Sequence, residues 1–294
     1  MLSDLRFAFR TLSRTPIVTL VAILSLALGI GGNTAMFSML DQILLRGLPV
    51  PRSGELVYVT SNGPRSGSNS NNNAGSSESI FSYPMFRDLE AKQIVLTGIA
   101  AHREVGANVA YQGQTFNTEV SEVSGQYFPV LQIAAARGRL LGPLDDQTRG
   151  GHPVAVLSHA SWATRFGSDE RILNQTMLVN GVTLTIVGVA PEGFTGVTMG
   201  STPDLYIPIS MHQSLNPTWK ALDNRRSYWV YLMARVKPGI PKAQAQSALN
   251  VLHRGIVNEV DAPLQKGASD NYMKRFRSKE INPTAGGSGP KPDA

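Results

Sequence analysis

Residues 17–40 read IVTLVAILSLALGIGGNTAMFSML and contain no Asp, Glu, Lys or Arg. A helix needs about 20 mostly apolar residues to cross the hydrocarbon core of a bilayer. The stretch therefore predicts one N-terminal transmembrane helix, which with its extension covers residues 16–48. Two alternatives are open: a cleaved secretory signal, whose apolar region commonly has about 7–15 residues, and a helix buried in a soluble core. The length of the apolar run favours the retained span.

Small and mildly polar residues are concentrated in the second half of this stretch. Lipid gives little reward for burying Leu against Leu, so membrane helices meet through small residues and occasional hydrogen bonds. We therefore expect this half to contact a partner helix. The predicted helix-packing residues are Gly29, Gly31, Gly32, Asn33 and Thr34. The glycines lack the preceding strand of a dinucleotide-binding loop, which argues against a nucleotide, and we expect no cofactor.

Residues 1–15 form a short segment in which apolar residues recur at helical spacing, with Arg6, Arg10 and Arg14 between them. Such a segment predicts an amphipathic helix in the membrane interface. Arginines next to a span mark the cytoplasmic side of a membrane, so the three arginines are predicted to orient the chain. The N-terminus is then cytoplasmic, and the main domain lies in a periplasm or its equivalent.

The composition excludes several classes of site. The 294 residues include no cysteine, so disulfides and Cys-based metal centres are excluded. The formal charge of +6 could indicate nucleic acid. However, several basic residues lie before the apolar stretch and after Lys266, and no helix-turn-helix, zinc-finger or RNP signature is present. Anionic lipid is the simpler partner for these residues, and no nucleic-acid partner is predicted.

Beyond the apolar stretch the pattern predicts an α+β protein. A strand at 55–60 and a helix at 83–95 resemble a later strand at 228–236 and a helix ending near Val260, so we expect two related βα halves with a β-rich insertion. The elements predicted between them are antiparallel strands over 99–123 with turns at Gly106 and Gln112-Gly113, a strand at 153–157, a helix at 158–166, a hairpin over 177–190 turning at Asn180-Gly181, and a strand at 204–209.

Two polar segments lack any apolar periodicity. Residues 61–79 are rich in Ser, Asn and Gly and predict a flexible loop, and residues 283–294 predict a disordered tail. The predicted domains follow from these boundaries. They are the interfacial helix 1–15, the membrane helix and its extension 16–48, a first half 49–125, an inserted β-rich subdomain 126–203, a second half 204–282 and the tail 283–294.

Several motifs resemble the MacB/FtsX-like ABC transporter permeases across about residues 1–285. The first membrane helix of that family is similar to residues 27–38, ALGIGGNTAMFS. The matching motifs are DLRFAFR at 4–10, LLR at 44–46, VSGQYF at 123–128, PVAVLS at 153–158 with Trp162 and RFG at 165–167, VNG at 179–181, IVGVAP at 186–191 and GFTG at 193–196.

The resemblance implies a periplasmic domain with a porter-like subdomain of two βα halves and a smaller β-rich insertion. It also implies a dimeric transporter in the bacterial inner membrane, in which a second permease chain pairs with this one as a homo- or heterodimer and a separate ABC ATPase supplies the energy. The family has three more membrane helices after the periplasmic domain, and no apolar run near 20 residues follows Leu40. We therefore expect either a truncated permease or one completed by another chain.

Catalytic motifs are absent from the sequence. There is no Walker A loop and no Gly-x-Ser-x-Gly elbow, and the histidines (His102, His152, His159, His212 and His253) have no metal-binding spacing. Trp219, Trp229 and Tyr231 are typical of a core, although a substrate path is the alternative.

We therefore predict a single-span membrane component of an ABC efflux or mechanotransmission system, not an enzyme. The alternative is a secreted or membrane-anchored extracytoplasmic binding module that belongs to no pump.

Overall fold

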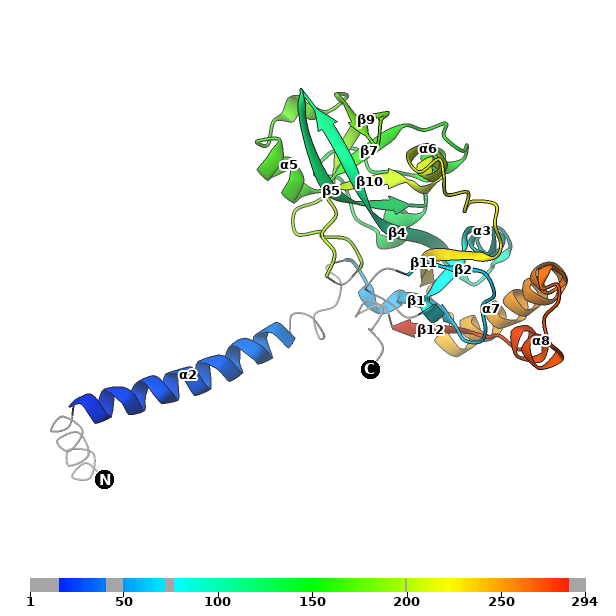
Figure 1. Ribbon diagram of the computed structural model, residues 1–294, viewed down its shortest axis with the longest axis horizontal. Coiled ribbons are helices and arrows are strands. Elements are labelled where there is room, and N and C mark those ends of the chain that lie inside the picture. The colour runs from blue at the N-terminus through cyan, green and yellow to red at the C-terminus, as the bar shows by residue number, and fades with distance from the viewer. Residues whose placement is uncertain (1–15, 41–49, 72–76, 199, 286–294) are drawn as a thin grey trace. The chain divides into compact units, whose positions relative to one another are not determined.

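The computed structural model describes residues 16–40, 50–71, 77–198 and 200–285 (Figure 1). The chain divides into two units, Met1–Arg46 and Gly47–Ala294. The predicted interfacial helix over 1–15, with Arg6, Arg10 and Arg14, lies outside the described residues.

The first unit contains helix α2, Pro16–Leu40, of 25 residues. Proline suits its first position because the missing N–H would have no intrahelical partner there. Large apolar side chains are exposed along the helix. Ile17 is 77 % exposed and Leu28 is 75 % exposed. Among the described parts of the chain, no helix meets the combined length and apolarity expected of a membrane span.

The second unit is built on a sheet with the strand order β12-β1-β11-β4-β5-β10-β7-β9-β6. Two short strands, β2 and β3, pair with β11, and β8 pairs with both β4 and β9. The strands are β1 Leu56–Ser61, β2 Ser68–Asn69, β3 Ile80–Ser82, β4 Leu96–Tyr111, β5 Gln114–Val123, β6 Arg137–Gly138, β7 Val154–Leu157, β8 Thr176–Val179, β9 Val182–Val189, β10 Leu205–Pro208, β11 Ser227–Val236 and β12 Ile281–Ala285.

Strand β11 is buried along its whole length, as its nearly continuous apolar sequence requires of a strand covered on both faces. The helices of this unit are α3 Tyr83–Lys92, α4 Tyr127–Leu131, α5 His159–Arg165, α6 His212–Leu215, α7 Lys242–Ile256 and α8 Asp270–Arg277. Serine side chains cap three of them: Ser82, Ser158 and Ser269 accept hydrogen bonds from backbone N–H groups of the first turn.

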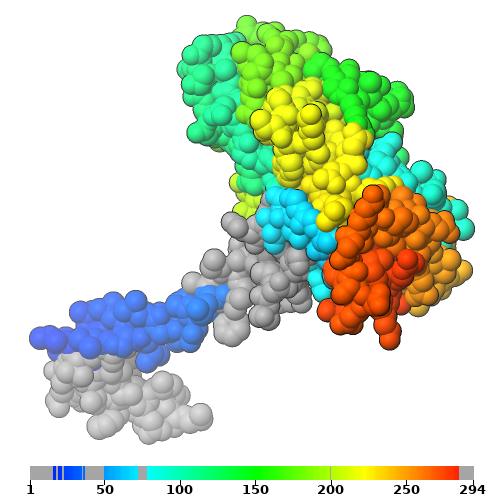
Figure 2. Space-filling model, turned by 45° about the vertical axis from the view of Figure 1, so that its right-hand side comes forward, coloured from blue at the N-terminus to red at the C-terminus, as the bar shows by residue number. Residues whose placement is uncertain are grey.

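Separate apolar clusters fill the space on the two parts of the sheet. One lies under α3 and α7 and includes Phe86, Leu249 and Trp229. Another lies under α5 and includes Val109 and Trp162. Strand β4 contributes to both, because its Leu96, Ile99 and Ala101 are in the first cluster and its Ala107 and Val109 are in the second. This strand therefore joins the two parts of the unit, and β5 pairs with it from His102 to Tyr111. In Figure 2 the C-terminal helices, orange to red, form one continuous region of the surface.

The mixed α/β architecture and most elements agree with the sequence predictions. The Asn180-Gly181 turn has φ values of 47° and 81°, as a type I′ hairpin needs. The turn predicted at Gly106 is wrong, because β4 continues through this residue, which pairs with Glu119 of β5. Only the second predicted turn, at Gln112-Gly113, reverses the chain.

The polar segment after β1 differs from the flexible loop predicted for residues 61–79. Its described residues are 61–71 and 77–79, and residues 61–71, here called the strap, are held against β11. The Ser70 N–H donates to the Tyr228 carbonyl of β11 at 2.9 Å, and β2 pairs in parallel with β11. These are polar contacts to distant residues, so the composition of the segment could not reveal them. Residues 72–76 lie outside the described residues.

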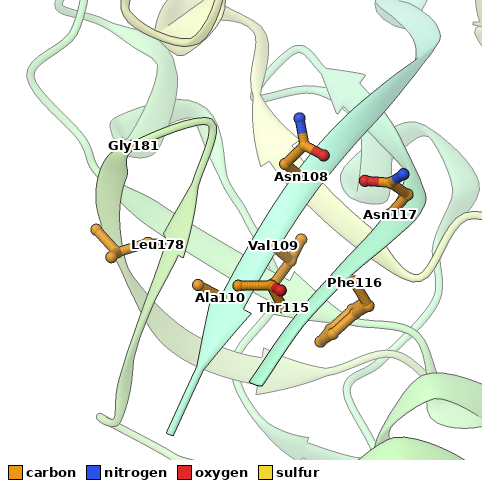
Figure 3. A pocket seen from close by; sticks show the side chains of 8 residues that line it. All are labelled: Asn108, Val109, Ala110, Thr115, Phe116, Asn117, Leu178 and Gly181. Carbon is orange, nitrogen blue, oxygen red and sulfur yellow. The ribbon is translucent and has the colours of Figure 1, made fainter. Parts of the chain in front are cut away.

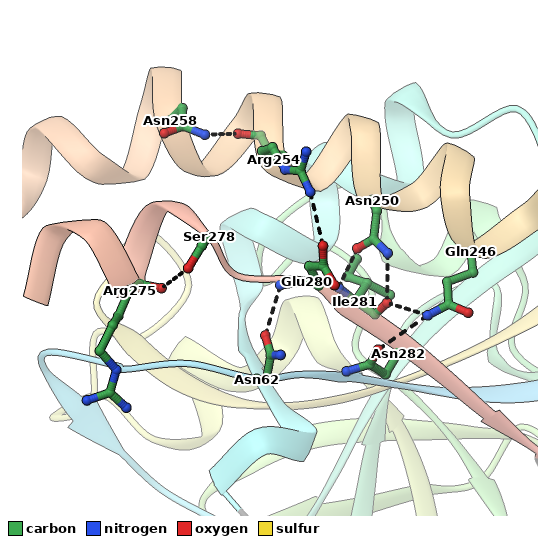
Figure 4. A network of polar contacts seen from close by, with 10 residues as sticks. All are labelled: Asn62, Gln246, Asn250, Arg254, Asn258, Arg275, Ser278, Glu280, Ile281 and Asn282. Carbon is green, nitrogen blue, oxygen red and sulfur yellow. Dashed lines mark hydrogen bonds and ion pairs between the residues drawn. The ribbon is translucent and has the colours of Figure 1, made fainter.

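The tail predicted as disordered over 283–294 begins as a strand. β12 pairs antiparallel with β1, with Val57 opposite Ala285 and Ser61 opposite Ile281. Side chains of α7 hold the start of β12 from its other side, and Figure 4 shows Gln246 and Asn250 reaching its backbone. The prediction is therefore wrong for residues 283–285. Residues 286–294 lie outside the described residues.

Candidate functional site

The predicted helix-packing residues lie together on α2. A Cβ atom added at Gly29, Gly31 or Gly32 would meet nothing within 4 Å. Asn33 and Thr34 are exposed, and the Thr34 hydroxyl donates to the Ile30 carbonyl of the same helix at 2.8 Å. Within the described residues of the first unit, this segment is therefore open on its surface.

A layer of buried polar side chains lies where β4 and β5 pass from one apolar cluster to the other. Glu122 of β5 and His212 of α6 are both fully buried, and Oε2 of Glu122 is 2.7 Å from Nδ1 of His212. The imidazole stacks on Trp229 with 4.4 Å between ring centroids. Such a pair costs free energy to bury, and removing either partner would leave the other buried without its counterpart at a greater cost.

Buried polar side chains continue along β4 on both faces of the sheet, because Glu122 is the register partner of Arg103 and not of His102 or Glu104. His102 Nδ1 is 3.3 Å from Oε1 of Glu104, and both side chains are buried. Burial alone would raise the pKa of Glu104, but the charge and hydrogen bond of His102 hold this pKa below its usual value. Arg103, between them, donates to the carbonyls of Ser70 and Trp229 at 2.6 and 3.0 Å. The layer therefore connects β4 to the strap and to β11.

Asp146 links two segments of the second unit, one that follows β5 and one that follows β10. Its Oδ2 accepts from the backbone N–H of Gly125, just after β5, at 3.1 Å. Its Oδ1 accepts from the N–H of Ser210, just after β10, at 2.9 Å. Burial raises the pKa of this carboxyl although the two N–H groups favour its charged form.

A pocket of about 570 Å³ lies at the tips of the β4–β5 and β8–β9 hairpins (Figure 3). We call it the hairpin pocket. It is lined by Asn108, Val109, Ala110, Thr115, Phe116, Asn117, Leu178 and Gly181. The two hairpins are joined at its edge, because Asn108 N–H donates to Oδ1 of Asn180 and Asn180 N–H donates to the Asn108 carbonyl, each at 2.9 Å.

A much smaller cavity, about 20 Å³, lies beneath the strap. Lys279, which is 5 % exposed, lines it with Arg65, Tyr228, His253 and Asp261. The Lys279 ammonium lies 4.0 Å from the ring centroid of Phe276, and no carboxylate among the described residues is paired with it. Burial lowers the pKa of Lys279 to about 7, with Arg65 adding to the shift.

The sequence reasoning missed the buried polar layer and the hairpin pocket. Its assignment of Trp229 and Tyr231 to a core is confirmed, since they are 0 % and 1 % exposed. Of the histidines, His102, His212 and His253 are buried. The sequence did contain one signal for the polar layer. His102, Arg103 and Glu104 are three consecutive ionisable residues inside a predicted strand whose other residues are mostly apolar. Within the described residues, no three His, Asp or Glu side chains converge as metal ligands do.

Comparisons with known proteins give the family. The model of the MacB-like periplasmic core domain matches residues 19–252. The probable export ATP-binding/permease protein MacB of Pseudomonas entomophila (strain L48) is 24% identical over 147 residues, which are 50% of this chain and 21% of that protein. The probable syringafactin export ATP-binding/permease protein SyfD of Pseudomonas syringae pv. tomato (strain ATCC BAA-871 / DC3000) is 26% identical over 144 residues, 49% of this chain and 20% of that protein.

This chain thus covers about a fifth of the length of these curated relatives. Among solved structures, the periplasmic region of MacB from Actinobacillus actinomycetemcomitans has the same fold, with a TM-score of 0.54 and 15% identity over 79% of this chain and 89% of that one. The family model covers most of the second unit and reaches into α2. The chain belongs to the MacB-like periplasmic core domain family.

Proposed function

We propose that this chain is the permease-type membrane component of an ABC transporter that works in efflux or mechanotransmission across the inner membrane. A separate ATPase supplies the energy, and a second permease chain pairs with this one. The family assignment supports the proposal, and so do the relatives, whose names describe export ATP-binding/permease proteins.

The observation that carries the proposal is the character of α2. Residues 17–40 carry no ionisable side chain, and large apolar side chains such as Leu20, Leu24 and Leu28 are 52 % or more exposed. Water would penalise this exposed surface by about 25 cal/mol per Å², whereas lipid would accept it. We therefore assign α2 to the bilayer.

In this proposal the first unit anchors the chain, with Arg6, Arg10 and Arg14 on the cytoplasmic side, and the second unit is periplasmic. Its porter-like halves, 49–125 and 204–282, surround the inserted subdomain 126–203. Gly29, Gly31, Gly32, Asn33 and Thr34 contact the partner permease helix, because side chains this small allow two backbones to approach.

Membrane extraction tests the anchor. The full chain is expressed in bacteria and its membranes are washed with alkaline carbonate, which removes peripheral proteins. We expect the chain to stay with the membrane and the double variant Leu24→Arg/Leu28→Arg to be released. The control is Val251→Arg, which replaces an equally exposed apolar residue of the second unit and should stay. Release of the unmodified chain, or cytosolic activity of a reporter fused after Ala294, would refute the proposal.

Disulfide crosslinking tests the helix contact. Because the chain has no cysteine, a single introduced cysteine reports only on its own position. We expect Gly32→Cys to crosslink two copies of this chain, or this chain to a partner permease carrying a cysteine in its first helix. Val21→Cys, at an exposed apolar residue in the first half of the helix and outside the predicted packing segment, is the control and should crosslink poorly. Equal crosslinking at both positions would contradict the assigned packing segment.

A further inference from the structure

The hairpin pocket has the size of a ligand site but no charged group. Its volume of about 570 Å³ lies within the range of about 300–1,000 Å³ that is usual for small-molecule pockets. None of its eight lining residues is ionisable. A phosphate, a carboxylate or an amine would lose its hydration there without gaining an opposite charge. The pocket therefore favours an uncharged ligand.

Two side-chain amides face this pocket from adjacent strands. Asn108 of β4 and Asn117 of β5 are direct register partners, so their side chains leave the sheet on the same face, with Cβ atoms about 4.5–5.5 Å apart. Both residues are exposed. Among the hydrogen bonds of the described residues, none uses either side-chain amide. Each amide offers two donors and an acceptor, so the pair can hold neighbouring hydroxyl groups of one ligand.

Apolar surface lies next to these amides on the same face. Ala110 and Thr115 are the next register pair on this face, and Ala110 is also opposite Leu178 of β8. Leu178 is 43 % exposed and therefore adds apolar surface beside Ala110. Amides that bind hydroxyls beside a small apolar surface match a sugar ring, which has hydroxyls at its edge and C–H groups on its face.

An extended peptide fits the pocket less well. Peptides commonly bind a sheet by adding a strand to a free edge. Here β4 pairs with β5 along one edge over 102–111, and β8 pairs with the other edge at Val109 and Ala110. The backbone of Asn108 is also satisfied, by Asn180. The β4 side of the pocket thus has no free backbone edge for a peptide. Strand β5 is paired with β10 only from Val120 to Val123, so a peptide strand could be added only along Gln114–Thr118.

We infer that the hairpin pocket is a binding site for an uncharged saccharide, which Asn108 and Asn117 hold through its hydroxyl or acetamido groups against Leu178 and Ala110. The site is independent of α2 and of any ATPase. Its test does not depend on the transporter assignment.

Calorimetric titration of the purified full chain tests this inference. The detergent is lauryldimethylamine oxide, because sugar-headed detergents would compete. The probes are neutral trisaccharides of glucose, galactose and N-acetylglucosamine, with trigalacturonate as the charged counterpart. We expect saturable binding of at least one neutral probe and weaker binding of trigalacturonate. No binding of any neutral probe at millimolar concentration, or tighter binding of trigalacturonate, would overturn the inference.

Matched variants locate the site. Asn117→Asp and Asn108→Asp keep the side-chain shape but remove the donors and add a charge, and each should weaken binding about tenfold or more. Asn271→Asp makes the same change at an exposed residue of α8 and should leave binding unchanged. Equal thermal melting of the three variants would show that each is folded. Unchanged affinity in folded Asn108→Asp and Asn117→Asp would place the saccharide elsewhere and refute the assignment.

Discussion

Asn250 holds the backbone of Ile281 with both functions of its amide. Its Oδ1 accepts from the Ile281 N–H at 2.6 Å, and its Nδ2 donates to the Ile281 carbonyl at 3.2 Å. The contact joins α7 to the first residue of β12 (Figure 4). It therefore fixes the C-terminal strand against the helix as well as against β1.

Asn250→Ala should release the start of β12. The change leaves the N–H of a buried residue without its partner and leaves the carbonyl only the longer contact from Gln246, and an unsatisfied buried donor costs about 1–3 kcal/mol. We expect a lower free energy of unfolding in urea and faster amide exchange over residues 281–285. Ser247→Ala, at an exposed position of the same helix, is the control and should change stability by less than about 0.5 kcal/mol. Unchanged exchange in Asn250→Ala would contradict the role of this amide.

This strand shows what the sequence could and could not predict. Local signals such as Asn180-Gly181, or the apolar run of β11, were enough to place most strands and helices, because they act within a few residues. Residues 281–285 (INPTA) carry no such signal, and they form a strand only because β1 offers an edge. Helix α8 was not predicted either, and its most buried residue, Phe276, packs on distant parts of the chain.

The candidate sites were missed for the same reason. Glu122 and His212 are 90 residues apart, and Asn108 and Asn117 become neighbours only through the register of β4 and β5. The sequence instead indicated α2 as the functional element, because the apolar composition of residues 17–40 is enough to predict a membrane helix.

Asp146→Asn should destabilise the junction between the two parts of the second unit. An asparagine keeps one acceptor oxygen, so one of the N–H groups of Gly125 and Ser210 would face an NH₂ donor. We expect a loss of about 1–3 kcal/mol in the free energy of unfolding, with faster amide exchange at these two residues. Asp223→Asn is the control. The Asp223 side chain, which pairs with Arg149, is 79 % exposed, so this ion pair should contribute less than about 1 kcal/mol. Equal losses in both variants would argue against this role of Asp146.

Gly188→Ala should displace β6. A Cβ atom at Gly188 would lie 1.9 Å from the Arg139 carbonyl oxygen, which belongs to the backbone and cannot rotate away. We expect a loss of stability of about 1–3 kcal/mol or more, as overpacking typically causes, seen as a lower melting temperature. Gly106→Ala is the matched control within β4, since nothing lies within 4 Å of the methyl group that it would introduce. It should be neutral or stabilising, because alanine lowers the entropy of the unfolded chain. Equal melting temperatures for the two variants would contradict the close approach of β6 to Gly188.

Lys279→Met should stabilise the protein at neutral pH and flatten part of its pH dependence. Burial, with the nearby Arg65, lowers the pKa of Lys279 to about 7 in the folded chain, against about 10.4 when unfolded. Between these values the unfolded chain binds one proton more than the folded chain. The free energy of unfolding therefore rises with pH in this window, by at most about 1.4 kcal/mol per pH unit. Below pH 7 both states are protonated and the cost of burying the cation is fully present.

The other groups around Lys279 do not reverse this sign. Asp261 favours the ammonium but is itself paired with Arg225 at 2.9 Å, and burial lowers the pKa of His253 to about 3, below the window. Urea unfolding between pH 6 and pH 9 gives the test. The stability gained by Lys279→Met should be largest at the acidic end and should shrink above pH 7. Lys274→Met, at an exposed lysine of α8, should parallel the unmodified chain. If Lys279→Met also paralleled it, Lys279 would not be a buried amine that loses its proton near neutrality.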